Sequence, residues 1–190
     1  LDKSFDEISI IIYIRKPISA AISLLSTSIK SGNTPKGLNL QIFSNYLNNL
    51  RIIKNWESVF LKKNIKIKLF EKNDFIDGDL IKDFCALCNI KMSPKFKYPN
   101  RFNETLNLPQ MKYLKYLNQH FPMFVDNKVN IKRGNLTQFI IQNFESPNYF
   151  LPTKKEFELF EEYFKDDDNY IKENYFPQKK QLWSTYKKGF

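Results

Sequence analysis

The sequence contains only two cysteines, one histidine and no long apolar run. Cys85 and Cys88 form a single C-x-x-C pair, which is too few thiols for a disulfide-stapled secreted domain. A zinc site would need two further ligands, and His120 is the only histidine, so we expect no metal site and interpret both cysteines as small hydrophobic side chains of a buried helix face. Because neither a signal peptide nor a membrane-length apolar run is present, we expect a cytoplasmic protein without a membrane span.

The charge of the chain is strongly positive. Thirty lysines and arginines against 20 acidic residues give a net charge of +10, a balance that attracts nucleotides, nucleic acid or acidic polysaccharide. The charge is spread along the chain and consists mostly of lysine, which favours a solvated surface and disfavours a dedicated nucleic-acid binder. With 190 residues, 18 Phe and 10 Tyr, the chain can build a real core, and we expect one domain over residues 1–190.

The stretch from Ile8 to Ser23 has the pattern of a strand, a tight turn and a helix. Ile8 to Ile14 is almost unbrokenly β-branched or aromatic, which predicts a strand buried on both faces. Pro17 suits the first turn of a helix, which Gly32 would end. Arg15 would then stand at the carboxyl end of the strand beside a helix N-terminus, where α/β sheets bind ligands. On geometry alone, Arg15 either holds an anion there or merely ends a buried strand.

The rest of the chain predicts a second strand and further helices. A helical pattern runs from Gln41 to about Lys62 with Trp56 on its buried face, and Ile65–Leu69 alternates as a strand with one wet face does. Helices are also indicated at about 79–89, after 103, at about 136–144 and after the capping box at 153–156. The simplest assembly is a parallel strand pair with a right-handed helical crossover in 1–90, followed by a helical, loop-rich remainder in 91–190.

Two polar segments are candidate ligand surfaces. In 91–107, Lys95, Lys97 and Arg101 are interleaved with aromatic side chains, as in surfaces that bind a sugar chain or a nucleotide. An ordinary exposed connector has the same composition. The three aspartates at 166–168 fall on the helix expected after 153 or just beyond it. They would bind a cation only with further oxygen ligands, so an acidic solvated turn is favoured over a cation site.

The pattern Tyr13-x-Arg15-x-Pro17-x5-Ser23 resembles the 3′-phosphate-binding segment of the PAPS-dependent sulfotransferases. The order of elements in 56–90 and the segment Asn103-Glu104-Thr105-Leu106 are similar to bacterial sulfotransferase-like chains. The resemblance implies a parallel-sheet α/β fold related to P-loop NTPases. It also implies the cofactor 3′-phosphoadenosine 5′-phosphosulfate (PAPS), with Arg15 and Ser23 on its 3′-phosphate. Lys16 departs from the Asn or Asp of many members, and Glu71 falls where the family has a strand-end Glu, for which we expect a structural role.

The implied activity is transfer of a sulfuryl group from PAPS to a hydroxyl or amine, such as that of a polysaccharide or glycolipid. The family's phosphate-binding loop and base would precede Leu1, because the chain contains no G-x-x-x-x-G-K-[ST] motif. We therefore interpret the chain as the C-terminal part of a bacterial-type enzyme, incomplete at the N-terminus and inactive alone. The alternative is a non-catalytic sulfotransferase-like module that binds acidic glycan or nucleic acid through 91–101. A kinase of the related fold is disfavoured by the Arg-to-Ser spacing.

Overall fold

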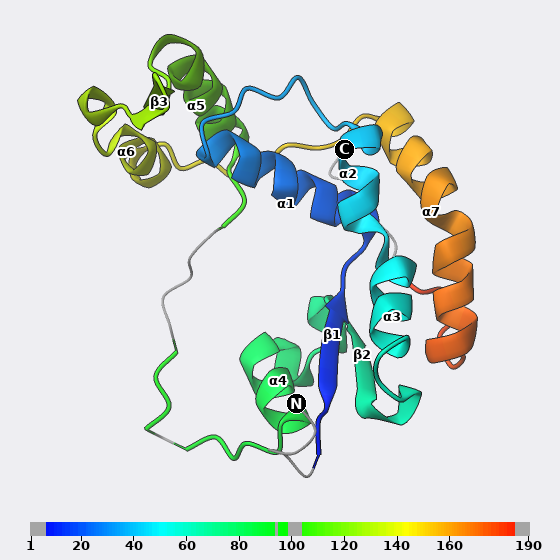
Figure 1. The fold of residues 1–190 in the computed structure, drawn as a ribbon. Helices are drawn as coiled ribbons and strands as arrows, with labels where there is room; N and C mark the ends of the chain where they lie inside the picture. Colours follow the sequence, from blue (N-terminus) through cyan, green and yellow to red (C-terminus); the bar gives the residue numbers. More distant parts are fainter. Residues whose placement is uncertain (1–6, 94, 99–103, 185–190) are drawn as a thin grey trace.

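The computed structural model describes residues 7–93, 95–98 and 104–184 as a mixed α/β structure, so Arg101 lies outside the described residues (Figure 1). Its strands are β1 (Ile10–Ile14), β2 (Ile65–Leu69), β3 (Phe124–Val125) and β4 (Lys128–Val129). Its α-helices are α1 (Pro17–Lys30), α2 (Leu40–Leu47), α3 (Asn49–Glu57), α4 (Leu80–Leu87), α5 (Leu108–His120), α6 (Leu136–Asn143) and α7 (Lys154–Tyr175). None of the helices in the described ranges is long and apolar enough to cross a membrane.

The strands β1 and β2 form a small parallel sheet, as the sequence predicts. Their register pairs Ile10 with Ile65 and Ile14 with Leu69, and the connection between them runs through α1, α2 and α3. One face of the sheet is apolar and packs on α3 and α7, with Ile12, Ile14, Ile53, Leu69 and Ile171 in one buried cluster. The prediction of a strand buried on both faces is wrong, because the alternate side chains of β1 are only half-buried.

The second face of the sheet is fixed to α4 by polar contacts. Tyr13 Oη donates to Asp83 Oδ2 at 2.7 Å, and Lys68 Nζ lies 3.1 Å from Asp83 Oδ1. Burial opposes the charge of Asp83, yet the hydrogen bonds from Tyr13 and Lys68 hold the pKa of this carboxyl below its usual value. Burial, together with the neighbouring Asp83, raises the pKa of Tyr13. The buried carboxylate therefore ties α4 to both strands.

The helix α1 connects two hydrophobic clusters, one at each of its ends. Near its N-terminus, Ile18 and Ala21 pack with Phe160 and Phe164 of α7 and with Leu47 of α2. Near its C-terminus, Leu25 and Ile29 pack with Leu114 of α5 and Ile140 of α6. The helix begins at Pro17 and ends before Gly32, whose φ of 96° is readily adopted only by glycine, so both predicted helix signals are confirmed.

The single helix predicted for residues 41–62 is wrong. The chain breaks at Asn48, which has extended backbone angles and whose side chain accepts from the Arg51 N–H at 2.7 Å, so that α2 and α3 are separate helices. The break also changes which side chains face the core. Trp56 is 41% exposed, and its ring lies against that of Phe60, with 5.7 Å between the ring centroids, so its predicted core position is wrong.

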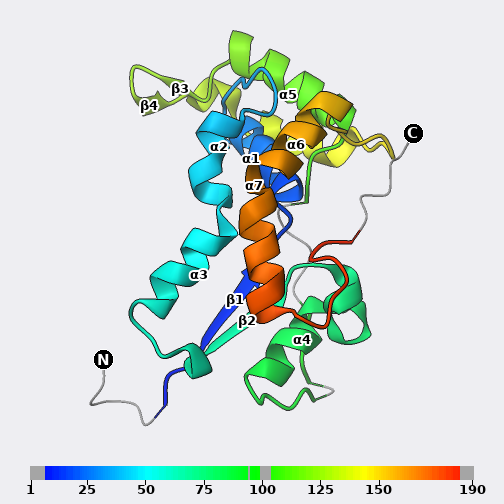
Figure 2. The same ribbon diagram turned by 90° about the vertical axis from the view of Figure 1, so that its right-hand side faces the viewer.

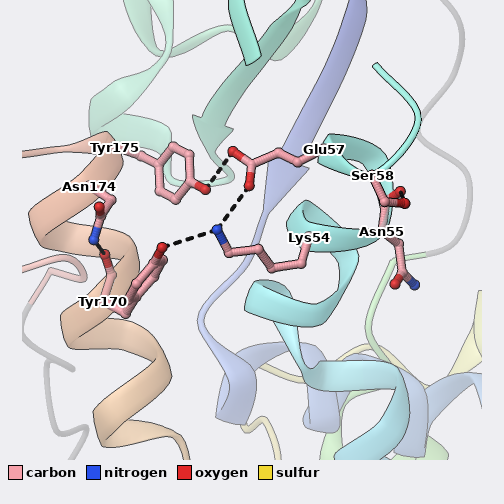
Figure 3. Close-up of polar contacts among 7 residues, drawn as sticks. All are labelled: Lys54, Asn55, Glu57, Ser58, Tyr170, Asn174 and Tyr175. Carbon is pink, nitrogen blue, oxygen red and sulfur yellow. Dashed lines mark hydrogen bonds and ion pairs between the residues drawn. The ribbon is translucent and has the colours of Figure 1, made fainter. Parts of the chain in front are cut away.

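A set of polar contacts joins α3 to α7 (Figure 3). Lys54 Nζ donates to the Tyr170 hydroxyl at 3.0 Å and to Glu57 Oε2 at 2.9 Å, while Tyr175 Oη donates to Glu57 Oε1 at 2.7 Å. The Tyr170 contact and the Glu57 ion pair raise the pKa of Lys54. Burial and the hydrogen bond to Glu57 raise the pKa of Tyr175 to about 12. These contacts fix α7 beside the helix that covers the sheet.

The cysteines and aspartates singled out from the sequence form no metal site. Cys85 is buried on α4 and Cys88, directly after this helix, is half-buried; both are free thiols. No cluster of three metal-ligating side chains exists among the residues whose positions are given. The aspartates at 166–168 lie within α7, which is one of the two positions expected for them, and they do not form a separate turn. Asp168 instead contacts the indole of Trp183.

Candidate anion-binding site

The carboxyl ends of β1 and β2 lie side by side at the start of α1. The Phe70 N–H donates to the Ile14 carbonyl at 2.7 Å, which continues the parallel ladder one residue past β2. The side chain of the buried Asn49 donates to the Arg15 carbonyl at 3.0 Å, which ties the turn before α1 to the start of α3. The backbone at Arg15 is therefore held from two sides.

The guanidinium of Arg15 lies over the Phe70 ring, 5.5 Å from its centroid, and the side chain is half-buried. Burial lowers the pKa of Arg15, although an arginine stays protonated in proteins. Within the described part of the chain, no carboxylate forms an ion pair with it. A partly desolvated cation without a counter-ion favours the approach of an anion.

A cavity of about 290 Å³ opens beside this guanidinium. Its lining comes from the β1–α1 turn, the end of β2 and the C-terminal segment, namely Arg15, Lys16, Ser19, Phe70, Glu71, Lys72, Asn73 and Ser184. No side chain caps the N-terminus of α1, and Pro17 at its first position has no N–H, so the next N–H groups, those of Ile18 and Ser19, are the donors of this helix end. The positive helix end and the arginine thus lie at one edge of the sheet.

Lys16, the departure from the family pattern, is directed toward α7. Its side chain is almost completely buried, with Nζ 3.0 Å from Glu161 Oε1 and 5.1 Å from the centroid of the Phe157 ring. It also lines a second cavity of about 400 Å³ between α7 and the C-terminal segment. Lys16 therefore joins two neighbouring cavities, and its charge is neutralised by an acidic partner while that of Arg15 is not.

The structure places the predicted serine away from the cavity. Ser23 lies two turns along α1, is half-buried and is not among the residues that line the cavity around Arg15. The serine that the structure brings to Arg15 is Ser19, in the first turn of α1. Sequence reasoning missed Ser19, although its position just after Pro17, at the expected helix start, was a usable signal.

Glu71 has the structural role that its position suggested. Both of its carboxylate oxygens accept from the Ser184 N–H, at 3.2 and 3.1 Å, which holds the C-terminal segment against the end of β2. The neighbouring Trp183 donates its indole N–H to Asp168 Oδ2 at 2.6 Å. Burial raises the pKa of Asp168 to about 7, the indole N–H opposes this shift, and nearby Glu161 adds to it. No sequence motif marks this contact, because it joins α7 to a segment without regular structure.

Lys95 and Lys97, the two described lysines of the predicted ligand surface in 91–107, do not line the Arg15 cavity. Both lysines are exposed, as are the rings of Phe96 and Tyr98 beside them.

Comparisons with protein-family models, with curated proteins and with solved structures found no match to the chain. The geometry and the residue pattern from Tyr13 to Ser23 are therefore the basis on which a function is proposed.

Proposed function

We propose that this chain supplies the 3′-phosphate site of a PAPS-dependent sulfotransferase. The observation that carries the proposal is the half-buried Arg15 guanidinium, which has no carboxylate partner among the described residues and lies at the carboxyl edge of a parallel strand pair beside the N-terminus of α1. Edges of this kind bind phosphates and nucleotides in α/β proteins. The resemblance of the pattern from Tyr13 to Ser23 to the sulfotransferase segment is what identifies the expected anion as the 3′-phosphate of PAPS.

The donor set around Arg15 fits a phosphate monoester. A guanidinium forms two parallel hydrogen bonds to phosphate oxygens, and helix N–H groups and a serine hydroxyl add further donors. Glu71 also lines the cavity, but both of its oxygens accept the Ser184 N–H, so the carboxylate is turned to a backbone partner. Lys72 adds a second cation to the lining.

In this proposal, PAPS supplies the sulfuryl group that passes to a hydroxyl or amine, such as that of a polysaccharide or glycolipid. The residues of this chain bind and orient the nucleotide. Arg15 holds the 3′-phosphate, the N–H groups of Ile18 and Ser19 donate hydrogen bonds to its oxygens, and Phe70 shields the guanidinium from water on one side.

Calorimetry with 3′-phosphoadenosine 5′-phosphate (PAP), the product nucleotide, tests the proposal. Arg15→Ala should weaken binding by about 1.5–3 kcal/mol, the scale of a charged hydrogen bond. Arg51→Ala is the matched control, because Arg51 is exposed on α3 and its side chain bonds only Asn45 in the described structure. Equal binding by all three proteins, or binding by none, would show that Arg15 does not hold this phosphate.

The two serines provide a second comparison. Ser23→Ala should weaken PAP binding if α1 presents Ser23 to the phosphate as the resemblance implies, whereas Ser19→Ala should do so if the phosphate occupies the cavity that the structure shows. A loss in one variant alone identifies the hydroxyl that contacts the phosphate. Unchanged affinity in both variants would leave the arginine and the helix N–H groups as the phosphate donors.

A second candidate function is a non-catalytic module that binds acidic glycan or nucleic acid. The exposed Lys95 and Lys97, with exposed aromatic rings between and after them, favour it. Binding of a charged polymer falls steeply with salt, while binding of one nucleotide in a clamp falls less. A salt series with heparin and with PAP separates the two functions, and Lys95→Ala with Lys97→Ala should weaken only the heparin binding.

A further inference from the structure

The region from 105 to 144 combines exposed apolar side chains with an almost entirely basic set of charges. It contains four lysines, one arginine that is buried, and a single acidic residue, Asp126. Its centre is the β3–β4 hairpin, which projects from the body of the molecule beside α5 (Figure 2). Ile131 is 87% exposed, Val129 is 66% exposed, and Phe121, Phe124 and Val125 are also exposed.

The hairpin has a defined structure that holds these side chains in place. Its two-residue turn, Asp126–Asn127, has positive φ at both positions, as a tight type I′ turn requires. At its base, the Asn130 N–H donates to the Met123 carbonyl at 2.9 Å, and the Asn130 side chain donates to the Pro122 carbonyl at 3.0 Å. The exposed apolar side chains are thus displayed on a hydrogen-bonded scaffold.

A buried arginine attaches this scaffold to the core. Arg133 is 3% exposed and donates to the Phe121 carbonyl at 2.6 Å, to Asn118 Oδ1 at 2.7 Å and to Thr137 Oγ1 at 3.0 Å. Asn118 in turn donates to the carbonyls of Ile29 and Asn33 at the end of α1. Burying a guanidinium among neutral acceptors costs desolvation free energy. This cost is borne in order to fix a segment whose apolar side chains face solvent.

We propose that the β3–β4 hairpin and the following turn dock on the surface of an anionic lipid membrane. Paired residues share a face of the ribbon, so Phe124 and Val129 lie on one face and Val125 and Lys128 on the other, which allows both faces to enter a lipid interface. Val125, Val129 and Ile131 line one shallow cavity with Phe121, and Lys132 also lines it. Apolar side chains flanked by lysines are the composition that binds anionic bilayer surfaces.

The aliphatic side chains favour lipid over nucleic acid. Proteins bind single-stranded nucleic acids by stacking the bases on aromatic rings. Valine and isoleucine have no ring and cannot form this contact. Among Phe121, Phe124, Val125, Val129 and Ile131, the two most exposed side chains, those of Val129 and Ile131, are aliphatic. Asp126 at the tip opposes deep insertion, so the docking is shallow, at the level of the lipid headgroups.

Flotation of the 190-residue chain with vesicles tests this proposal. The chain should bind vesicles of equimolar phosphatidylcholine and phosphatidylglycerol and bind vesicles of phosphatidylcholine alone much less. Val129→Ser with Ile131→Ser should weaken binding to the anionic vesicles by about tenfold or more. The matched control is Val59→Ser with Leu61→Ser, two aliphatic residues after α3 that are 74% and 66% exposed, and this variant should bind as the wild type does.

Variants of the charged residues test the electrostatic part of the membrane binding independently. Lys128→Gln should weaken vesicle binding by about fivefold, and Asp126→Asn should strengthen it. The proposal is overturned if the wild type does not bind anionic vesicles or if the hairpin and control variants lose binding equally. Sedimentation velocity tests the alternative that a second copy of the chain binds this surface. A dimer that is lost in the Val129→Ser, Ile131→Ser variant, without vesicle binding by the wild type, would assign the surface to a second copy of the chain and overturn the proposal.

Discussion

At the scale of single residues, the two cations at the end of β1 differ in whether a carboxylate neutralises their charge. Arg15 and Lys16 are neighbours in the sequence, and Arg15 is half-buried while Lys16 is buried. Lys16 is paired with Glu161, whereas no carboxylate of the described residues pairs with Arg15, whose guanidinium lies over the Phe70 ring. Their roles therefore differ. Lys16 fastens α7 to the start of α1, and Arg15 keeps a charge that an anion can use.

Asp168 gives a pH-dependent prediction at the same scale. Its pKa is raised to about 7 in the folded chain, above the value of about 3.9 of an unfolded aspartate. The folded state therefore binds the proton more tightly, and the stability that Asp168 contributes is full below about pH 4 and is lost as pH rises to about 7. In Asp168→Asn, whose amide oxygen can still accept from Trp183, this pH dependence should be missing.

The measurement is urea unfolding across that pH range. Asp166→Asn is the control, because Asp166 lies two residues earlier on α7 and is exposed, so it should retain the wild-type dependence. The same change of unfolding free energy with pH in the wild type and in Asp168→Asn would contradict the assignment.

At the scale of elements, short-range side-chain to backbone bonds determine the helix boundaries. Asn48 separates α2 from α3, Asp79 caps α4 by accepting from the N–H groups of Ile81 and Lys82, and Thr153 opens α7 with a capping box. The caps at Asp79 and Thr153 are predictable because they precede a clear apolar period. The cap at Asn48 is not, since the apolar period continues across it and only the local backbone shows the break.

The contact between α3 and α7 gives a stability prediction. Tyr175→Phe removes the hydroxyl that donates to Glu57 at 2.7 Å and should lower the free energy of unfolding by about 1 kcal/mol. Tyr163→Phe, on the same helix with an exposed ring, is the control and should change it by less than about 0.5 kcal/mol. Chemical denaturation compares the two variants. If both variants unfold alike, the Tyr175 contact does not stabilise the α3–α7 pair.

At the scale of the whole molecule, α1 is the element on which the parts depend. Its N-terminal half packs with α2 and α7, its C-terminal half packs with α5 and α6, and its first turn borders the anion cavity. The sequence predicts this helix, both parallel strands and the position of Arg15, because each follows from local patterns. The participation of Ser184 and the Asp168–Trp183 contact could not be predicted, since they depend on how segments far apart in the chain come together.

The most direct measurement is a thermodynamic cycle that couples Arg15 to the 3′-phosphate. Calorimetry gives the affinities of the wild type and of Arg15→Ala for PAP and for adenosine 5′-monophosphate, which lacks the 3′-phosphate. If Arg15 holds that phosphate, the substitution should cost about 1.5–3 kcal/mol with PAP and almost nothing with the monophosphate. An equal cost with both nucleotides, or no cost with either, would contradict the proposed site.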